Sequence, residues 1–333
     1  MNCYLSDAEL TESNRSSEHI IPAALGNNMV SNNLLCRECN NGLASQIDAG
    51  LINFYSYLYG LVLQARPNTR TSASLIGKTE SGEEIRFTGQ MRADDHMTIK
   101  LPDGKEIVIT GTEDELRKKA LKILRQFKGK HPEINPEEWL ARATWQEKKI
   151  EELVYFSNHD TKHSIAGGPE FFRDIKKIAI NFYLSFGFDR KYINGVINQV
   201  KEGIPAPQVI SKFYYPSIRP THKLGDSEVS HVIKLVGDPQ MGVLYCYVEL
   251  FNLNHSIILL NNHYDGPALD KQYCYDVLTS TYLQKEISLP FKNREHVTDH
   301  FKLTIDTNPQ GEAAYRRTRK ILEASIRQKG HIS

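Results

Sequence analysis

Long apolar runs are missing from this chain of 333 residues, and so is an excess of charge of either sign. No segment approaches the roughly 20 consecutive apolar residues that a membrane-spanning helix needs. The first ten residues, MNCYLSDAEL, are acidic and have no apolar core, so we do not expect a secretory signal. The formal net charge of +1 excludes a strongly basic coat protein for nucleic acid, although local basic patches remain open.

Cysteines are few, and their number is odd. Five cysteines in a chain without an export signal favour a reducing compartment, so we expect a cytoplasmic protein whose thiols bind metal or pack in a core. The glycine motifs that bind phosphate loops and dinucleotides are also absent from the sequence. The sequence therefore has no signature of the common nucleotide-binding enzymes.

Apolar periodicity and turn signals predict an α+β protein with two parts. A small N-terminal module covers residues 1–62, and a larger mixed α+β domain covers residues 63–333. The patterns predict the following elements: helices over 47–64, 114–130, 135–149, 168–188 and 311–328, a loop over 65–79, a hairpin over 96–111, a strand within 150–158, and a mostly strand-like region over 208–288.

The chemistry-bearing residues of the first module lie in two short stretches. Glu18 and His19 are adjacent in SSEHIIP, and Cys36, Cys39 and Asn40 follow in CRECNN. A C-x-x-C turn lets two thiolates reach one tetrahedral metal ion. A histidine is substantially neutral at pH 7 and can accept a proton from water, while a carboxylate and an amide oxygen suit Mg²⁺ or Mn²⁺.

Four sequence elements resemble, in their order and spacing, the HNH endonuclease superfamily over residues 3 to about 50. They are E-H-I-I-P, L-G, N-N-L-L-C-x-x-C-N-N and I-D. The resemblance is to the group that pairs Glu-His with a Cys-x-x-Cys-Asn knuckle. It implies a ββα-metal finger that hydrolyses DNA phosphodiester bonds. It also implies that Glu18 and Asn40 bind one Mg²⁺ or Mn²⁺ ion and that His19 is the general base.

The same resemblance implies a loop asparagine that holds the loop over the histidine. Asn32 and Asn33 both fit this role, and the spacing does not decide between them. Asp48 lies eight residues beyond Asn40 on the same predicted helix, where it either anchors the finger or approaches the metal ion.

One position departs from the family pattern. Relatives with this knuckle usually carry a second C-x-x-C near the N-terminus, whereas here Cys3 is followed by Ser6 at the fourth-ligand position. Two alternatives stay open: Cys3, Cys36 and Cys39 bind a structural Zn²⁺ ion completed by water or Asp7, or the thiols pack as small apolar groups.

Because the first module is acidic, other residues must neutralise the phosphates of DNA. The candidates are Arg37 in the knuckle and four residues of the terminal helix: Arg316, Arg317, Arg319 and Lys320. We expect DNA as partner and no membrane. The larger domain is expected to position DNA, form a homo-oligomer or sense a signal.

A role in restriction or defence against phage follows from the resemblance alone. Two alternatives remain: a non-catalytic treble-clef-like nucleic-acid-binding protein, and an RNA-directed nuclease. The presence of both Glu18 and His19 argues against the first, because binding alone needs neither.

Overall fold

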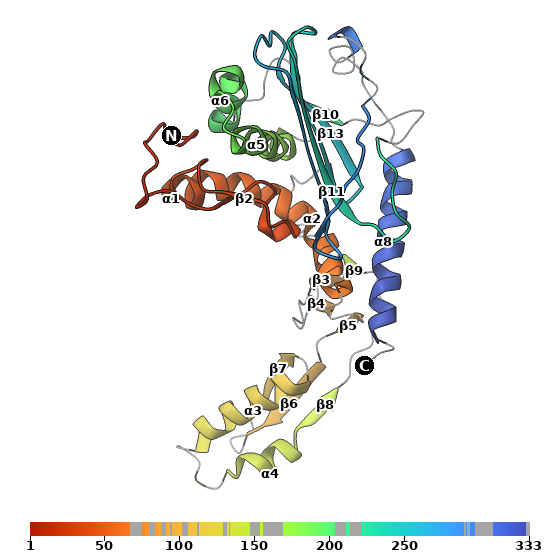
Figure 1. Cartoon of the computed structure of the whole chain (residues 1–333). Helices are drawn as coiled ribbons and strands as arrows, with labels where there is room; N and C mark the ends of the chain where they lie inside the picture. Colours follow the sequence, from red (N-terminus) through yellow and green to blue (C-terminus); the bar gives the residue numbers. More distant parts are fainter. Residues whose placement is uncertain are drawn as a thin grey trace. The chain divides into compact units, whose positions relative to one another are not determined.

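The computed structural model describes most of the chain, and the following residues are covered: 1–66, 75–79, 84–87, 91–93, 95–101, 106–111, 113–128, 132, 134–146, 154–155, 169–203, 211–213, 221–289, 291, 294–296 and 309–330. The fold is α+β, as predicted (Figure 1). Met1–Thr71 and Asp160–Ser333 form one compact unit, and Ser72–His159 form a second. These units do not coincide with the division expected at residues 62 and 63, because the N-terminal segment packs with elements from the second half of the chain.

The first unit begins with a small finger. Its elements are β1 (Glu18–His19), η1 (Ala23–Leu25), β2 (Val30–Ser31), α1 (Arg37–Cys39), the π-helical turn η2 (Asn40–Ala44) and the long helix α2 (Ser45–Ala65). The two short strands pair antiparallel. Between them Gly26 adopts φ +88°, a left-handed conformation that favours glycine and closes the turn after η1. The predicted helix over 47–64 is confirmed as part of α2.

A six-stranded antiparallel sheet forms the core of this unit. Its strands run in the order β10 (Ser211–Phe213), β13 (Asn254–Asn261), β12 (Val243–Leu250), β11 (Ser230–Asp238), β14 (Leu269–Asp276) and β15 (Thr281–Tyr282). All eight residues of β12 are buried, since this strand is central and covered on both faces. The strand-like pattern predicted over 208–288 is confirmed for the described residues of that range.

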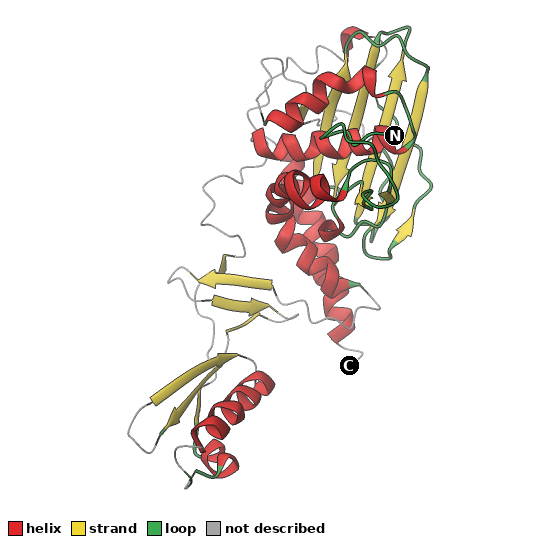
Figure 2. Cartoon of the chain, turned by 90° about the vertical axis from the view of Figure 1, so that its left-hand side faces the viewer, coloured by secondary structure: helices red, strands yellow, loops and turns green. Residues whose placement is uncertain are grey.

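Helices α5 (Pro169–Ser185) and α6 (Asn194–Glu202), joined through η3 (Arg190–Ile193), lie against one face of this sheet (Figures 1 and 2). Helix α2 of the finger packs against both α5 and the terminal helix α8 (Pro309–Gly330). The predicted helices over 168–188 and 311–328 are confirmed within their described residues. The finger therefore shares its packing with helices that lie more than 100 residues away in sequence.

A buried histidine joins the finger to the sheet. The ring of His231 donates through Nε2 to the carbonyl of Leu25, at 2.9 Å, and accepts at Nδ1 from the backbone N–H of Phe251, at 3.2 Å. This pairing holds the neutral imidazole, and burial lowers the pKa of His231 to about 4.

The second unit contains two small sheets. One has the order β5 (Met91–Ala93), β4 (Glu84–Phe87), β3 (Leu75–Thr79) and β9 (Val154–Tyr155), and the other has β7 (Glu106–Gly111), β6 (Asp95–Lys100) and β8 (Thr144–Gln146). Helices α3 (Glu113–Lys128) and α4 (Pro136–Ala141) accompany the three-stranded sheet, and their apolar side chains share a core with β6.

Two expectations for this unit were wrong. The segment predicted as a loop over 65–79 contains β3, whose backbone pairs antiparallel with β4. The turn-forming residues Pro67 and Gly77 concealed this strand in the sequence pattern. The helix predicted over 135–149 ends at Ala141, and β8 follows because Thr144–Gln146 pairs with β6. The antiparallel pairing of β6 with β7 confirms the predicted hairpin, although its turn at 103–104 lies outside the described residues. Among the described residues, no helix is both long and apolar enough to cross a membrane.

Candidate active site of the N-terminal finger

Glu18 and His19 form the whole of strand β1, and their side chains point to opposite sides of it. Glu18 pairs in register with Ser31 and His19 with Val30. The side chain of Glu18 is directed inward, where the residue is only 3% exposed, while His19 is partly exposed. Within the described part of the chain, no hydrogen bond engages the imidazole of His19. Its nitrogens are therefore available to water or substrate.

Asn40 lies beside this strand although it belongs to the knuckle. Its side-chain Nδ2 donates to Ser16 Oγ at 3.1 Å and to the carbonyl of Ser17 at 3.4 Å. Ser16 and Ser17 directly precede Glu18 in the chain. The structure thus brings together the two separate stretches that the sequence singled out.

A buried lysine from helix α5 contacts Glu18. Lys177 is 1% exposed, and its Nζ lies 2.5 Å from Glu18 Oε1 and 2.9 Å from both carboxylate oxygens of Asp48. Burial acts to lower the pKa of Lys177, but the two carboxylates outweigh this effect and raise it, so the ammonium stays charged. Burial raises the pKa of Asp48, and the nearby charges of Lys177 and His19 oppose the rise. Three charged groups, Lys177, Glu18 and Asp48, therefore share one cluster.

Two further polar residues of α5 hold the finger. Asn181 is fully buried and donates from Nδ2 to Glu18 Oε1 at 2.9 Å and to the carbonyl of His19 at 3.2 Å. Its Oδ1 accepts the hydroxyl of Tyr4 at 2.8 Å. Asp174 Oδ2 accepts the backbone N–H of Leu51 at 2.7 Å.

Sequence reasoning missed Asp174, Lys177 and Asn181. Their signal was present, because polar residues at i, i+3 and i+7 form one stripe on an otherwise apolar helix. Nothing in the sequence says that this stripe meets Glu18, which is 159 residues from Lys177.

The donor atoms near β1 suit a hard divalent cation. Glu18 Oε1 is engaged by Lys177 and Asn181, but within the described residues no hydrogen bond reaches Glu18 Oε2. Asn40 uses its amide N–H groups for Ser16 and Ser17, and in the same part of the chain its Oδ1 accepts no hydrogen bond. Carboxylate and amide oxygens are the ligands that Mg²⁺ and Mn²⁺ prefer. The residues present therefore fit such an ion.

The thiols of Cys3, Cys36 and Cys39 form a second cluster, in which all three sulfur atoms lie within 4.8 Å of one another. Cys36 caps α1 by accepting the N–H of Cys39 at 3.5 Å. Ser6 Oγ lies 3.7 Å from Cys36 Sγ and also hydrogen-bonds to the other two thiols. The cluster could hold a metal ion such as Zn²⁺, and the nearest fourth donor is Ser6. Asp7 instead forms an ion pair with Arg190.

The local hydrogen bonds affect these thiols differently. Burial acts to raise the pKa of Cys3, but hydrogen bonds from Ser6 and from backbone groups outweigh it and lower the pKa to about 7. Burial raises the pKa of Cys39 to about 12, and the charge on Cys3 adds to this rise. All five cysteines of the chain are free thiols.

The loop between β1 and β2 is held by an asparagine that the sequence analysis did not select. Asn27 is buried, and its Nδ2 donates to the carbonyls of Ile21, at 3.1 Å, and Met29, at 3.3 Å. Asn32 and Asn33 are exposed, and among the described residues no side-chain hydrogen bond ties either of them to this loop.

The basic candidates differ in their surroundings. Arg37 is exposed on the knuckle. Arg317 donates to the backbone carbonyls of Glu228, at 3.1 Å, and Gly225, at 2.6 Å, so it anchors α8 to the loop before β11. Arg319 forms an ion pair with Glu323 at 2.7 Å. The remaining two candidates, Arg316 and Lys320, are exposed on α8.

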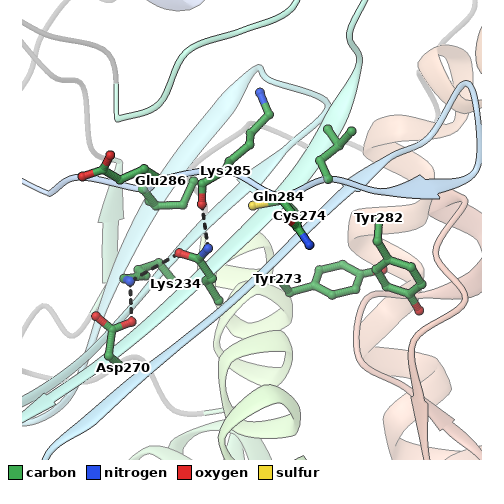
Figure 3. A pocket seen from close by; sticks show the side chains of 11 residues that line it. Lys234, Asp270, Tyr273, Cys274, Tyr282, Gln284, Lys285 and Glu286 are labelled. Carbon is green, nitrogen blue, oxygen red and sulfur yellow. Dashed lines mark hydrogen bonds and ion pairs between the residues drawn. The ribbon is translucent and has the colours of Figure 1, made fainter.

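The six-stranded sheet also carries a pocket of about 760 Å³ between β14 and the segment after β15 (Figure 3). Lys234 pairs there with Asp270, and Lys285 pairs with Glu228 at 2.5 Å. Because each lysine has a carboxylate partner, the pocket presents no unbalanced positive charge to a phosphate. None of its lining residues belongs to the finger.

The hairpin, the knuckle and the following helix make a ββα finger, in which the amide of Asn40 contacts the two residues that precede Glu18 and His19. The family model for HNH endonucleases matches residues 3–56, which is this same segment. The N-terminal segment is therefore similar to HNH endonuclease domains, a class whose members bind divalent metal ions and act on nucleic acid. Searches of curated proteins and of solved structures found no match.

Proposed function

We propose that this protein is a metal-dependent endonuclease that hydrolyses DNA phosphodiester bonds at the finger. The observation that carries the proposal is the contact between Asn40 and the residues that precede Glu18 and His19, at 3.1 Å to Ser16 Oγ. In this contact the amide of the knuckle lies next to the segment that leads into the acid–imidazole pair of β1.

In the proposed reaction His19 accepts the proton of the attacking water. Glu18 Oε2 and Asn40 Oδ1 are the oxygens that would hold one Mg²⁺ or Mn²⁺ ion. When bound, the ion supplies Lewis-acid stabilisation of the phosphate and of the leaving oxygen. Asn27 takes the role of the loop asparagine, because its two donated hydrogen bonds support the loop that follows His19.

The thiols of the knuckle are proposed to bind a structural Zn²⁺ ion. DNA contacts are proposed for Arg37 and for the exposed residues of α8, above all Arg316 and Lys320. A cytoplasmic location and a role in restriction or phage defence remain predictions from composition and from the family resemblance.

The test is cleavage of supercoiled plasmid with Mg²⁺ or Mn²⁺. We expect His19→Ala and Asn40→Ala to reduce the rate by roughly a hundredfold or more, since general-base catalysis contributes about 10²–10⁴. His263→Ala, which alters an exposed histidine away from the finger, is the matched control and should cleave like the wild type. Equal cleavage rates in all four proteins would refute the assignment of His19 and Asn40 to the active site. Parallel reactions on duplex and single-stranded RNA distinguish the RNA-directed alternative.

One observation favours the non-catalytic alternative. Glu18 is 3% exposed and paired with Lys177, an arrangement that a purely structural ion pair would also show. In that case the wild type would shift DNA in a gel without ever cutting it, whatever divalent cation is added.

A further inference from the structure

The ammonium of Lys177 contacts the carboxylate that is proposed to bind the metal ion. Nζ is 2.5 Å from Glu18 Oε1, and Lys177 is only 1% exposed. A buried side chain cannot reach a DNA phosphate. Any effect of Lys177 on the reaction must therefore pass through Glu18 or Asp48.

The cluster of Lys177, Glu18 and Asp48 carries more negative than positive charge. Glu18 and Asp48 carry one negative charge each, and Lys177 returns one positive charge. With one of the two Glu18 oxygens taken by Lys177 and Asn181, a divalent cation finds only Oε2 on that side chain. A positive charge this close also repels a second cation in a medium of low dielectric constant.

Resting on the function proposed above, we propose that Lys177 is a positioning residue that shares Glu18 with the metal ion and so keeps the affinity of the DNA-free protein for divalent cations low. The ammonium fixes the carboxylate and confines the ion to one of its oxygens. Tight binding then needs a phosphate of the substrate as a further ligand. The ion is retained mainly when DNA is present.

The neighbouring lysine of α5 provides a matched control. Lys176 is on the same turn but donates from Nζ to Gln199 Oε1 at 3.2 Å, and it does not contact Glu18 or Asp48. Its removal changes the total charge of the protein as much as removal of Lys177 does. Only the position of the charge differs.

The experiment measures Mn²⁺ binding to the DNA-free protein by the loss of the free-ion electron paramagnetic resonance signal. We expect Lys177→Met to bind Mn²⁺ roughly tenfold or more tightly than the wild type, because a neighbouring positive charge is lost. Lys176→Met should bind like the wild type. An unchanged or weaker affinity in folded Lys177→Met protein overturns the inference.

Lys177→Met leaves the buried carboxylate of Glu18 and the partly exposed carboxylate of Asp48 without a counter-charge and so threatens folding. The double variant Lys177→Met/Asp48→Asn removes one of these carboxylates and keeps the net charge of the wild-type cluster. If Lys177 restricts Glu18 directly, this variant still binds Mn²⁺ more tightly than the wild type. If it matches the wild type, only long-range charge matters and the inference is wrong.

Glu18→Gln separates this inference from the proposed function. If Glu18→Gln binds Mn²⁺ like the wild type, the metal site itself is wrong, whatever Lys177→Met does. If Glu18→Gln loses Mn²⁺ but Lys177→Met equals the wild type, the metal site stands and only the role of Lys177 falls.

Discussion

Replacing Ser6 by cysteine should complete the zinc site proposed for the knuckle, because the other three thiols already converge. The sulfur atoms of Cys3, Cys36 and Cys39 lie within 4.8 Å of one another, and Ser6 Oγ is 3.7 Å from Cys36 Sγ. In a tetrahedron with Zn–S bonds of about 2.3 Å, neighbouring sulfurs are separated by about 3.8 Å. Residue 6 is therefore already at the distance of a fourth ligand.

The expected gain follows from the energy of a four-ligand site. Structural zinc sites bind with about 10–16 kcal/mol at pH 7, so one thiolate of four accounts for about 3 kcal/mol. This corresponds to roughly a hundredfold in Kd. With zinc in excess the variant should also unfold at a temperature several degrees higher, since a ligand that binds only the folded state stabilises it by mass action.

Competition against a chromophoric chelator measures both affinities, and mass spectrometry of the intact protein gives the zinc content. Asp7→Asn is the control, and it should leave the affinity unchanged because Asp7 pairs with Arg190. The reasoning is refuted if Ser6→Cys binds zinc no more tightly than the wild type. If the purified wild type also carries no zinc, and Cys36→Ser is as stable as the wild type, the thiols are an apolar remnant.

Four further predictions concern other residues. His231 is neutral in the fold with a pKa of about 4, so it contributes full stability above about pH 6.5, and this contribution is lost as the pH falls toward 4. The loss is about 3 kcal/mol, seen in urea titrations, and an equally steep pH dependence in His231→Gln would contradict it. Arg317→Ala should lower the free energy of unfolding by about 2 kcal/mol without changing DNA affinity, because its hydrogen bonds go to backbone carbonyls. Lys320→Ala should lower the salt dependence of DNA binding by about one ion without changing stability, and the reverse pattern in these two variants would refute the assignment. Tyr4→Phe should cost about 1 kcal/mol of stability through the lost hydrogen bond to Asn181, and a melting temperature equal to that of the wild type would show the bond to be dispensable.

Site residues could be predicted from the sequence where the motif that identifies them lies within one short stretch of the chain. Local motifs identify five such residues: the pair Glu18 and His19, the knuckle of Cys36 and Cys39, and Asn40. The long helices were predictable for the same reason, since amphipathic periodicity is a local property.

The environment of the site was not predictable, because it comes from distant segments. The sequence suggested that Asp48 anchors the finger or approaches a metal ion, and in the structure it binds Lys177 at 2.9 Å. The resemblance implies Asn32 or Asn33 as the loop asparagine, and in the structure the asparagine that hydrogen-bonds within the loop is Asn27. Burial depends on what packs over a loop, and here Tyr273 of the sheet covers Asn27 and donates to its Oδ1.

Because residues of α5 hydrogen-bond to Glu18, the finger cannot be transferred to another protein without them. A fragment that ends after α2 would carry the whole recognisable motif but would leave Glu18, Asp48 and the hydroxyl of Tyr4 without their partners. Grafting this finger onto another carrier therefore requires a helix with the spacing of Asp174, Lys177 and Asn181.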